Sequence, residues 1–553
     1  MIKDQLAELV AEAALIAQER GTLPAVTLPI STVEHPQKPE HGDYASTLSM
    51  KLAKAAGMKP MDIAFAIHRC LPDNHPAIEK VTTAPPGFLN FTLRPGWLQR
   101  QVGAILDAGQ GFGFVDVGHG QRVQIEYVSA NPTGPVHIGN GRGGVLGSAL
   151  AAVLRAAGYQ VQQEYYINDT GAQMGVFQRS IWARYLQALG QDVPMPEDGY
   201  GGDYMVELAR NIAVHEGDRF AKPPEAENQQ ALAELGMKTL LAGIKTDLEG
   251  LGVHYDEWYS ERSLFQDGTY ERAMAVLKAG GHVAEREGAQ WFQSTALGED
   301  KDNVLVRTSG IPTYFASDAA YHYNKFLVRK FDRVINIWGA DHQGHVSRVK
   351  AITAALGGDA SKLDVLLTQL VTLKRGAEVV RLSKRSGDII ALSDVLDEVG
   401  KDACRFFFLA RSADSQMDFD LELAKKQSNE NPVYYVQYGH ARTAGVLRTG
   451  VERGVEWQDG DVSLLNDPAE LALIRKMLQL PEVIETAAVN LEPHHLAHFA
   501  QDLATTFHNF YEQCRVITDD VPLSQARLKL VAATQHVLAR TLGLMGLSAP
   551  ERM

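Results

Sequence analysis

Residues 123–144 read VQIEYVSANPTGPVHIGNGRGG, and this stretch decides the fold of the central part of the chain. Val123, Ile125 and Tyr127 alternate with polar residues, which predicts a strand, and a loop rich in Pro and Gly follows it. Apolar residues on one face predict a helix over 141–157, and residues 161–167 predict a second strand. A strand–helix–strand unit indicates a parallel sheet that binds ligands at the carboxyl ends of its strands.

Working outward from this unit, the sequence predicts three domains. Residues 1–115 combine helical periodicity with short strands, which predicts a small α+β domain that ends at the glycine-rich segment 109–113. Residues 116–410 carry the parallel α/β pattern, with a mainly helical insertion expected over about 178–300. Residues 411–553 are helical almost throughout.

The composition excludes several classes of protein. Apolar residues make up 45% and charged residues 22% of the 553, as in ordinary globular proteins. The three cysteines lie far apart, so we expect no disulfide framework, and we expect no metal site in the protein itself. No apolar run approaches the ~18 residues that span a membrane, and the N-terminus lacks a signal-peptide core, so we expect a cytoplasmic protein.

The net charge of −14 argues against indiscriminate binding to nucleic acid. Basic residues nevertheless gather in the middle of the chain, and residues 321–350 contain six of them against two acids. A local basic surface is therefore still possible. The helical segment 411–553 carries a net charge of −6, so any RNA-binding face there needs an uneven distribution of its basic residues.

The most informative motif is His137-Ile-Gly139-Asn140, which opens the helix after the first strand. A helix N-terminus offers free N–H groups to phosphate, and glycines let a purine lie close to the backbone. A glycine-rich turn with a structural histidine is the simpler alternative. Gly139, Gly141 and Gly144 also match the G-x-G-x-x-G pattern of nicotinamide-dependent oxidoreductases, but a ten-residue loop with two prolines separates them from the strand.

A second motif, Arg381-Leu382-Ser383-Lys384-Arg385, lies more than two hundred residues later. Alone it indicates a solvated basic loop. Together with the first motif it suggests a loop that closes over a bound triphosphate, where a lysine stabilises the charge of the departing pyrophosphate.

These two motifs resemble the HIGH and KMSKS signatures of class I aminoacyl-tRNA synthetases, with Asn140, Arg381 and Leu382 as departures. Further segments resemble the arginyl-tRNA synthetases, in the order of that family, and they are 41–47, 85–93, 126–144, 165–174, 304–322, 339–345, 381–411 and 431–442. The resemblance implies a Rossmann-type catalytic domain, preceded by a domain that touches the tRNA elbow and followed by a helical anticodon-binding domain. A synthetase for another amino acid, or an adenylating ligase without RNA, is the alternative within the class.

The activity that the resemblance implies is arginine–tRNA ligation. ATP with Mg²⁺ activates L-arginine to arginyl-adenylate, and the arginyl group then passes to the terminal adenosine of its tRNA. We expect a monomer with no membrane partner.

Carried over position by position, the resemblance implies three groups of site residues. Those for ATP and catalysis are Pro135, His137, Gly139, Asn140, Gly141, Arg381, Leu382, Ser383 and Lys384. Those for arginine are Glu126, Ser129, Asn131, His137, Tyr314, Asp318, Asp341 and His342, and those for tRNA are Tyr434, Tyr435 and Arg442. Taken singly, Glu126 could face solvent and Asp318 could cap a helix, and the tyrosines could be a core stripe.

Overall fold

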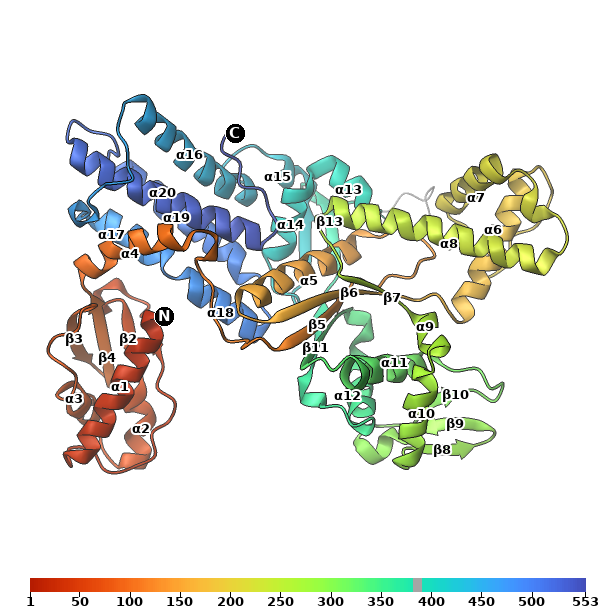
Figure 1. Cartoon of the computed structure of the whole chain (residues 1–553), viewed down its shortest axis with the longest axis horizontal. Helices are drawn as coiled ribbons and strands as arrows, with labels where there is room; N and C mark the ends of the chain where they lie inside the picture. Colours follow the sequence, from red (N-terminus) through yellow and green to blue (C-terminus); the bar gives the residue numbers. More distant parts are fainter. Residues whose placement is uncertain (381–389) are drawn as a thin grey trace.

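The computed structural model describes residues 1–380 and 390–553, and it divides into an N-terminal unit, a central α/β unit and a C-terminal helical unit (Figure 1). The N-terminal unit has a four-stranded antiparallel sheet in the order β1-β2-β4-β3, covered by helices. Its elements are α1 (Ile2–Glu19), β1 (Val33–Glu34), β2 (Tyr44–Ser46), α2 (Leu48–Ala56), α3 (Pro60–His68), β3 (Ile78–Ala84) and β4 (Phe88–Leu93).

The central sheet has five parallel strands in the order β12-β11-β5-β6-β7, which confirms the predicted parallel α/β fold. Strand β5 lies in the middle. The strands are β5 (Arg122–Tyr127), β6 (Gln160–Ile167), β7 (Glu257–Ser260), β11 (Arg333–Gly339) and β12 (Leu363–Thr368). Their register aligns Glu126 with Glu164 on one side and with Asn336 on the other, so three polar side chains lie in a row at the carboxyl edge.

Helix α5 (Ile138–Ala156) connects β5 to β6 and lies tightly against the sheet. A Cβ atom at Gly147 would lie 2.3 Å from the ring of Tyr127, so only glycine permits this approach. The helix begins three residues before the predicted start at 141, because His137 already occupies the N-cap position.

The insertion predicted as one block over 178–300 is in fact interrupted by a strand of the main sheet. The first inserted segment contains α6 (Ala172–Ala188), α7 (Asp203–Glu216) and α8 (Glu225–Gly250), and then β7 joins the sheet beside β6. The second contains α9 (Glu261–Gln266), α10 (Thr269–Ala279), β8 (Val283–Arg286), β9 (Ala289–Phe292), β10 (Asn303–Val306) and α11 (Tyr314–Tyr323). With only four residues, β7 is too short to show an alternating pattern in the sequence.

After α12 (Val346–Ala355) come β13 (Val371–Arg375) and β14 (Glu378–Val379), which form a small sheet with β15 (Met417–Asp420), a strand between the first helices of the helical unit. Its helices are α13 (Leu392–Val399), α14 (Lys401–Leu409), α15 (Leu421–Lys425), α16 (Pro432–Glu452), α17 (Pro468–Met477), α18 (Leu480–Asn490), α19 (His495–Gln513) and α20 (Val521–Leu544). Helix α4 (Pro95–Ala108), which the sequence assigned to the N-terminal domain, packs against α17 and α20 (Figure 1). Among the helices that the structure describes, none has the length and hydropathy needed to cross a membrane.

Candidate active site

The turn that begins α5 presents His137 as its N-cap residue. The Nδ1 atom of His137 accepts a hydrogen bond from the Gly139 N–H at 3.1 Å, which leaves the proton on Nε2 and directs that N–H outward. Burial lowers the pKa of His137, and the charge of Asp341 opposes this only in part, so the ring is neutral at pH 7. The histidine can therefore donate one hydrogen bond from Nε2 to a phosphate oxygen.

The same turn contains a polar atom that lacks a partner. The side-chain Oδ1 of Asn140 is buried and accepts no hydrogen bond from any residue in the described ranges. Gly141, in contrast, is explained by packing, because a Cβ there would lie 2.8 Å from Leu392 of α13. A buried amide oxygen without a donor is expensive unless a ligand satisfies it, which favours Asn140 as a ligand contact.

Glu126, at the end of β5, is buried and already paired. Its Oε2 atom accepts a hydrogen bond from Lys325 Nζ at 2.6 Å, and Oε1 accepts one from Ser129 Oγ at 3.0 Å. Lys325 is fully buried, donates to Asn336 Oδ1 at 2.9 Å and lies 4.1 Å from the ring centre of Tyr321. The possibility that Glu126 faces solvent is therefore excluded.

Glu164 forms the second buried ion pair of this row. Its carboxylate accepts hydrogen bonds from the guanidinium of Arg329, one of them at 2.9 Å, and from the Tyr321 hydroxyl. Lys325 and Arg329 belong to the basic segment 321–350, which the sequence offered as a possible basic surface. The structure corrects this interpretation for both residues, because their charges are neutralised beneath the sheet edge.

Asp318 lies inside α11 and not at its N-cap, which is Thr313. Burial, together with the negative charges of Glu126 and Glu261, raises the pKa of its carboxyl to about 7. None of the ion pairs found among residues 1–380 and 390–553 includes this carboxylate, and its recorded hydrogen bond, from His322, goes to the backbone oxygen. Asp318 is thus a half-buried acid that forms no ion pair with the described residues, although the charges of Lys325 and Arg348 partly favour its ionised form.

Two further polar groups complete this cluster, and the sequence did not reveal them. Glu261 begins α9 directly after β7, is only 2% exposed, and its Oε2 has no hydrogen-bond partner among the described residues. Burial raises its pKa. The hydroxyl of Tyr166, at the end of β6, is equally buried and equally without a partner there, and Glu261, Asp318 and Glu126 all act on it electrostatically. The position of Glu261 after a strand end would have been a signal, had β7 been recognised.

The chain between β5 and α5 bends sharply beside these acids. Val128 and Ser129 have φ of 69° and 40°, in the left-handed region that residues other than glycine rarely adopt. The Ser129 hydroxyl bridges two strands, because it donates to Glu126 and accepts from the Tyr166 N–H at 3.1 Å. Asn131 is exposed and accepts a hydrogen bond from the Asn168 amide at 3.0 Å. Strain of this kind is typical of functional sites.

The other residues predicted for arginine lie at the first turn of α11 and in the turn after β11. Tyr314 occupies the first turn of α11, is 47% exposed and has its ring near Gly171. Asp341 and His342 lie in the turn after β11, are both exposed, and approach each other to 3.5 Å. The structure therefore brings the carboxyl ends of β5, β6, β7 and β11 together with α11, as the parallel fold predicts.

The residues Arg381, Leu382, Ser383 and Lys384 lie outside the described ranges. Both flanks are placed, however. The Ile390 carbonyl accepts a hydrogen bond from the Ile138 N–H at 3.2 Å, and Leu392 donates to Val136 at 2.8 Å, so the chain after 389 is paired with the His137 turn. Before 381, the Val380 N–H donates to Leu373 of β13 at 2.9 Å. The chain that resumes at residue 390 thus lies beside the His137 turn.

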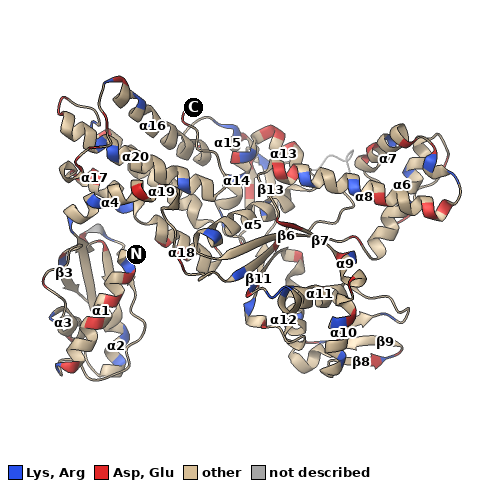
Figure 2. Ribbon diagram, in the orientation of Figure 1, with Lys and Arg blue, Asp and Glu red and all other residues tan. Residues whose placement is uncertain are grey.

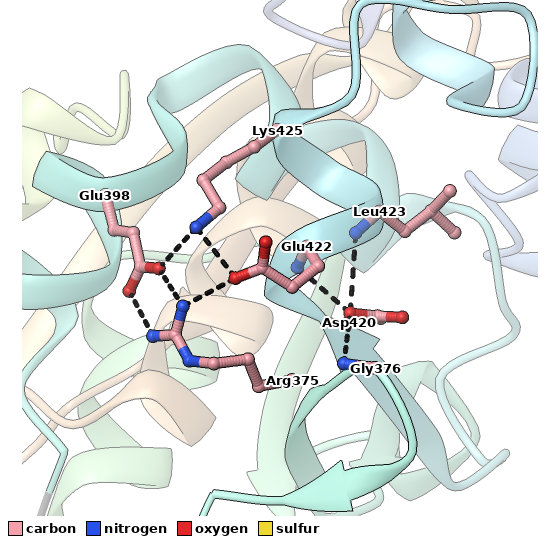
Figure 3. A network of polar contacts seen from close by, with 7 residues as sticks. All are labelled: Arg375, Gly376, Glu398, Asp420, Glu422, Leu423 and Lys425. Atoms are coloured by element: carbon pink, nitrogen blue, oxygen red, sulfur yellow. Dashed lines mark hydrogen bonds and ion pairs between the residues drawn. The ribbon is translucent and has the colours of Figure 1, made fainter.

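A charged network supports the strand pair β13–β14 from outside (Figure 3). Arg375 contacts Glu398 of α13 and Glu422 of α15, both at 2.7 Å, and Lys425 contacts the same two carboxylates at 2.9 Å. Figure 2 likewise shows basic and acidic residues side by side around α13 and α15. In this part of the molecule, most of the basic charge is locally neutralised.

The residues predicted for tRNA lie on α16, half-exposed beside α19. Tyr434 and Tyr438 stack with ring centres 6.2 Å apart, and Tyr435 lies 5.1 Å from His508. Arg442 donates to the Tyr438 hydroxyl at 2.9 Å and lies 4.2 Å from the ring centre of Tyr511. They form an aromatic row with one cation, which suits stacking on nucleotide bases.

Comparisons with known proteins agree along the whole chain. Residues 1–93 match the family described as the arginyl tRNA synthetase N terminal domain, and residues 436–553 match the DALR anticodon binding domain. Residues 101–418 match the catalytic domain of tRNA synthetases class I (R).

Individual proteins match over similar lengths. An arginine–tRNA ligase of Dehalococcoides mccartyi is 55% identical over 100% of this chain and 99% of its own length. One from Heliobacterium modesticaldum is 50% identical, over 95% of this chain and 94% of its own. The structure of Thermus thermophilus arginyl-tRNA synthetase superposes over the full length of both chains with a TM-score of 0.79, at 24% identity. The chain belongs to the arginyl-tRNA synthetase family.

Proposed function

We propose that the carboxyl edge of the central sheet activates arginine with ATP for transfer to tRNA. As a member of its family the chain is an arginine–tRNA ligase, an ATP-using enzyme of translation, with tRNA, arginine and ATP as substrates. The observation that carries the site assignment is the cluster of Asp318, Glu261 and Tyr166, in which the Glu261 and Tyr166 oxygens are buried without a partner and neither carboxylate forms an ion pair with a described residue. Because the chain belongs to a family of aminoacyl-tRNA ligases, the oxidoreductase alternative is rejected.

A guanidinium group has five N–H donors in one plane and is always charged. Asp318 and Glu261 can accept hydrogen bonds from two edges of such a plane. Tyr314 lies on α11, one turn before Asp318. Glu126 contributes negative charge from below while Lys325 holds it in place. The α-amino and carboxylate groups of arginine would lie toward Ser129, Asn131, Asp341 and His342, of which Asp341 acts electrostatically on His137.

ATP fits the turn that begins α5. Its N-terminal N–H groups and the Nε2–H of His137 can donate to phosphate, and Asn140 Oδ1 can accept from an adenosine or a water. Pro135, Gly139 and Gly141 shape the turn. Arg381 and Lys384, with Leu382 and Ser383, would add positive charge for the pyrophosphate.

Mg²⁺ fits this site only as a companion of the nucleotide. Within the described residues no group of three or more His, Cys, Asp or Glu side chains could hold a metal. Magnesium commonly retains several waters and binds substrate phosphates. When bound there it would neutralise phosphate charge.

The chemistry then follows from position and charge. The arginine carboxylate attacks the α-phosphorus in line and pyrophosphate leaves, and His137 and Lys384 stabilise the phosphate oxygens. A ribose hydroxyl of the 3′-terminal adenosine of the tRNA then attacks the arginyl carbonyl carbon, so that an ester forms, the anhydride bond to the phosphate breaks and AMP leaves. For tRNA itself we propose that residues 1–115 touch the elbow, that 411–553 bind the anticodon arm through Tyr434, Tyr435 and Arg442, and that the protein is a cytoplasmic monomer.

The test is ATP–pyrophosphate exchange with each of the twenty amino acids, with and without total tRNA, followed by tRNA charging. Arginine alone should support exchange and charging. Exchange with lysine or with a neutral amino acid at a comparable rate would contradict the assigned pocket. If Glu261→Gln charges tRNA with arginine as well as the wild type does, Glu261 is not part of the site.

A further inference from the structure

The motif His41-Gly-Asp-Tyr-Ala-Ser-Thr47 has no part in the active site, and the structure gives it a different place. It forms β2 and the turn before it, at the side of the N-terminal unit that faces α17 and α18 (Figure 1). Gly42 has φ of 90°, and a Cβ there would lie 2.6 Å from the Phe91 carbonyl oxygen. Glycine is required, and it lets Asp43 and Tyr44 project toward the helical unit.

Two contacts join these residues to the helical unit. Asp43 Oδ1 pairs with Arg475 Nε of α17 at 2.5 Å, while Asp43 Oδ2 accepts from the Leu93 N–H at 2.6 Å. The Tyr44 hydroxyl donates to Glu482 Oε1 of α18 at 2.6 Å. The side chains of Asp43 and Glu482 are only 9% and 13% exposed, while those of Arg475 and His35 are 33% and 38% exposed, so solvent screens these contacts only in part.

His35 adds a third contact, and its geometry fixes its charge. Its Nε2 lies 3.1 Å from Glu482 Oε2 and its Nδ1 lies 2.9 Å from the Asp43 carbonyl oxygen. Because both partners are acceptors, both ring nitrogens must donate, which requires the imidazolium form. Burial alone would lower the pKa of His35, but Glu482 and Asp43 raise it overall.

We infer that His35, Asp43, Tyr44, Arg475 and Glu482 form a latch that positions the N-terminal unit on the helical unit, so that both present one continuous surface to tRNA. The inference rests on the proposed function. Units of one chain move relative to one another unless a strong interface prevents it. A ligand that touches both units binds more tightly when their relative position is fixed beforehand, because it does not have to restrict that motion itself. Small substrates that touch only the central unit gain nothing from the latch.

The test compares Arg475→Ala and Tyr44→Phe with Lys476→Ala in the full chain. Lys476 is the next residue on α17 and pairs with Asp502 inside the helical unit, so Lys476→Ala removes the same charge without touching the latch. If only about one molecule in ten remains latched, the KM for tRNA in charging should rise about tenfold in Arg475→Ala. The kcat at saturating tRNA, and the KM values for arginine and ATP, should stay within about twofold of wild type.

Two further measurements separate positioning from general stability. Arg475→Lys keeps the charge and should restore most of the tRNA KM, and the double variant Arg475→Ala, Asp43→Asn should be no worse than Arg475→Ala alone, since both remove one pair. Small-angle scattering should show a larger radius of gyration in Arg475→Ala than in Lys476→Ala. An unchanged tRNA KM in Arg475→Ala, or equal rises for all three substrates, would overturn the latch. Failure of the wild-type protein to charge tRNA with arginine would instead overturn the proposed function.

Discussion

Two sets of carboxylates lie within one site, and they differ in whether a cation is paired with them. Below the sheet edge, Glu126 and Glu164 are paired with Lys325 and Arg329. Above it, Asp318 and Glu261 have no basic partner among the residues that the structure describes. A buried charge without a counter-charge is unfavourable, and the raised pKa values of Asp318 and Glu261 reflect that cost. The lower set therefore maintains the site, and the upper set marks where a cationic substrate binds.

The largest effect is expected from Asp318→Asn, which removes a charge from the upper set. Loss of one partner of a shielded ion pair costs about 3 kcal/mol or more, and each 1.4 kcal/mol is about tenfold, so the KM for arginine should rise about 100-fold. The ratio of kcat/KM for arginine over citrulline, measured with tRNA present, should fall in parallel. Asp300→Asn, at an exposed position, is the matched control. An unchanged ratio would place the guanidinium elsewhere.

Lys325→Met tests the lower set, where the expected effect is on stability. It leaves Glu126 buried with no cation, which should cost about 3 kcal/mol and lower the Tm of the full chain. The double variant Lys325→Met, Glu126→Gln removes both charges and should recover most of the Tm. If the single variant is as stable as wild type, Glu126 does not need Lys325, and the distinction between the two sets fails.

A third test uses pH, because the raised pKa of Asp318 belongs to the ligand-free protein. Below about pH 7 its carboxyl is mostly protonated, and a guanidinium must displace that proton to bind. The apparent KM for arginine should therefore fall about tenfold per pH unit as pH rises toward 7 and then level off. The stability of the free protein has the opposite trend, since a raised carboxyl pKa means that stability declines as pH rises from the ordinary value of 3.8 to about 7.

Two controls make the pH test specific. The pKa of His137 is lowered, so its ring protonates at lower pH than a free imidazole, away from the upper part of the range in which Asp318 titrates. In Asp318→Asn the dependence of KM on pH should disappear, although the KM itself is high. A slope that survives in this variant would assign the titration to another group, of which Glu261 is the first candidate.

The two sets also differ in how far the sequence could predict them. Glu126 and Asp318 were expected because they stand in long segments that resemble a known family. Lys325 stands in a segment that the sequence offered only as a possible basic surface, because a sequence shows the sign of a side chain but not which carboxylate the fold places beside it. Glu261 was missed since a four-residue strand has no recognisable period, and so its strand-end position was invisible.

The larger features were predicted for a different reason. The β5–α5–β6 unit is long and strongly patterned, and the parallel sheet follows from it. The place of α4 was not predictable in the same way. The amphipathic face of α4 could pack on the N-terminal unit or on the helical unit. Only the tertiary structure shows that it lies on α17 and α20 of the helical unit.

The smallest effect is expected from Arg375→Gln. This variant breaks an exposed ion pair and so distinguishes the contribution of ion pairing from that of burial. Arg375 contacts two carboxylates, as Lys325 contacts one, but its side chain is 48% exposed. Exposed ion pairs contribute little, because water screens the charges and two long side chains lose rotational freedom. We therefore expect kcat/KM for arginine within about twofold of wild type, and any loss should shrink further as salt is added. The measurement is arginine-dependent exchange at low and high salt, with Lys374→Gln, which breaks a neighbouring exposed pair to Asp418, as the control. A tenfold loss of kcat/KM for arginine that occurs in Arg375→Gln but not in Lys374→Gln, and that salt does not change, would contradict this expectation. It would show that an ion pair can be important in this protein even when it is exposed.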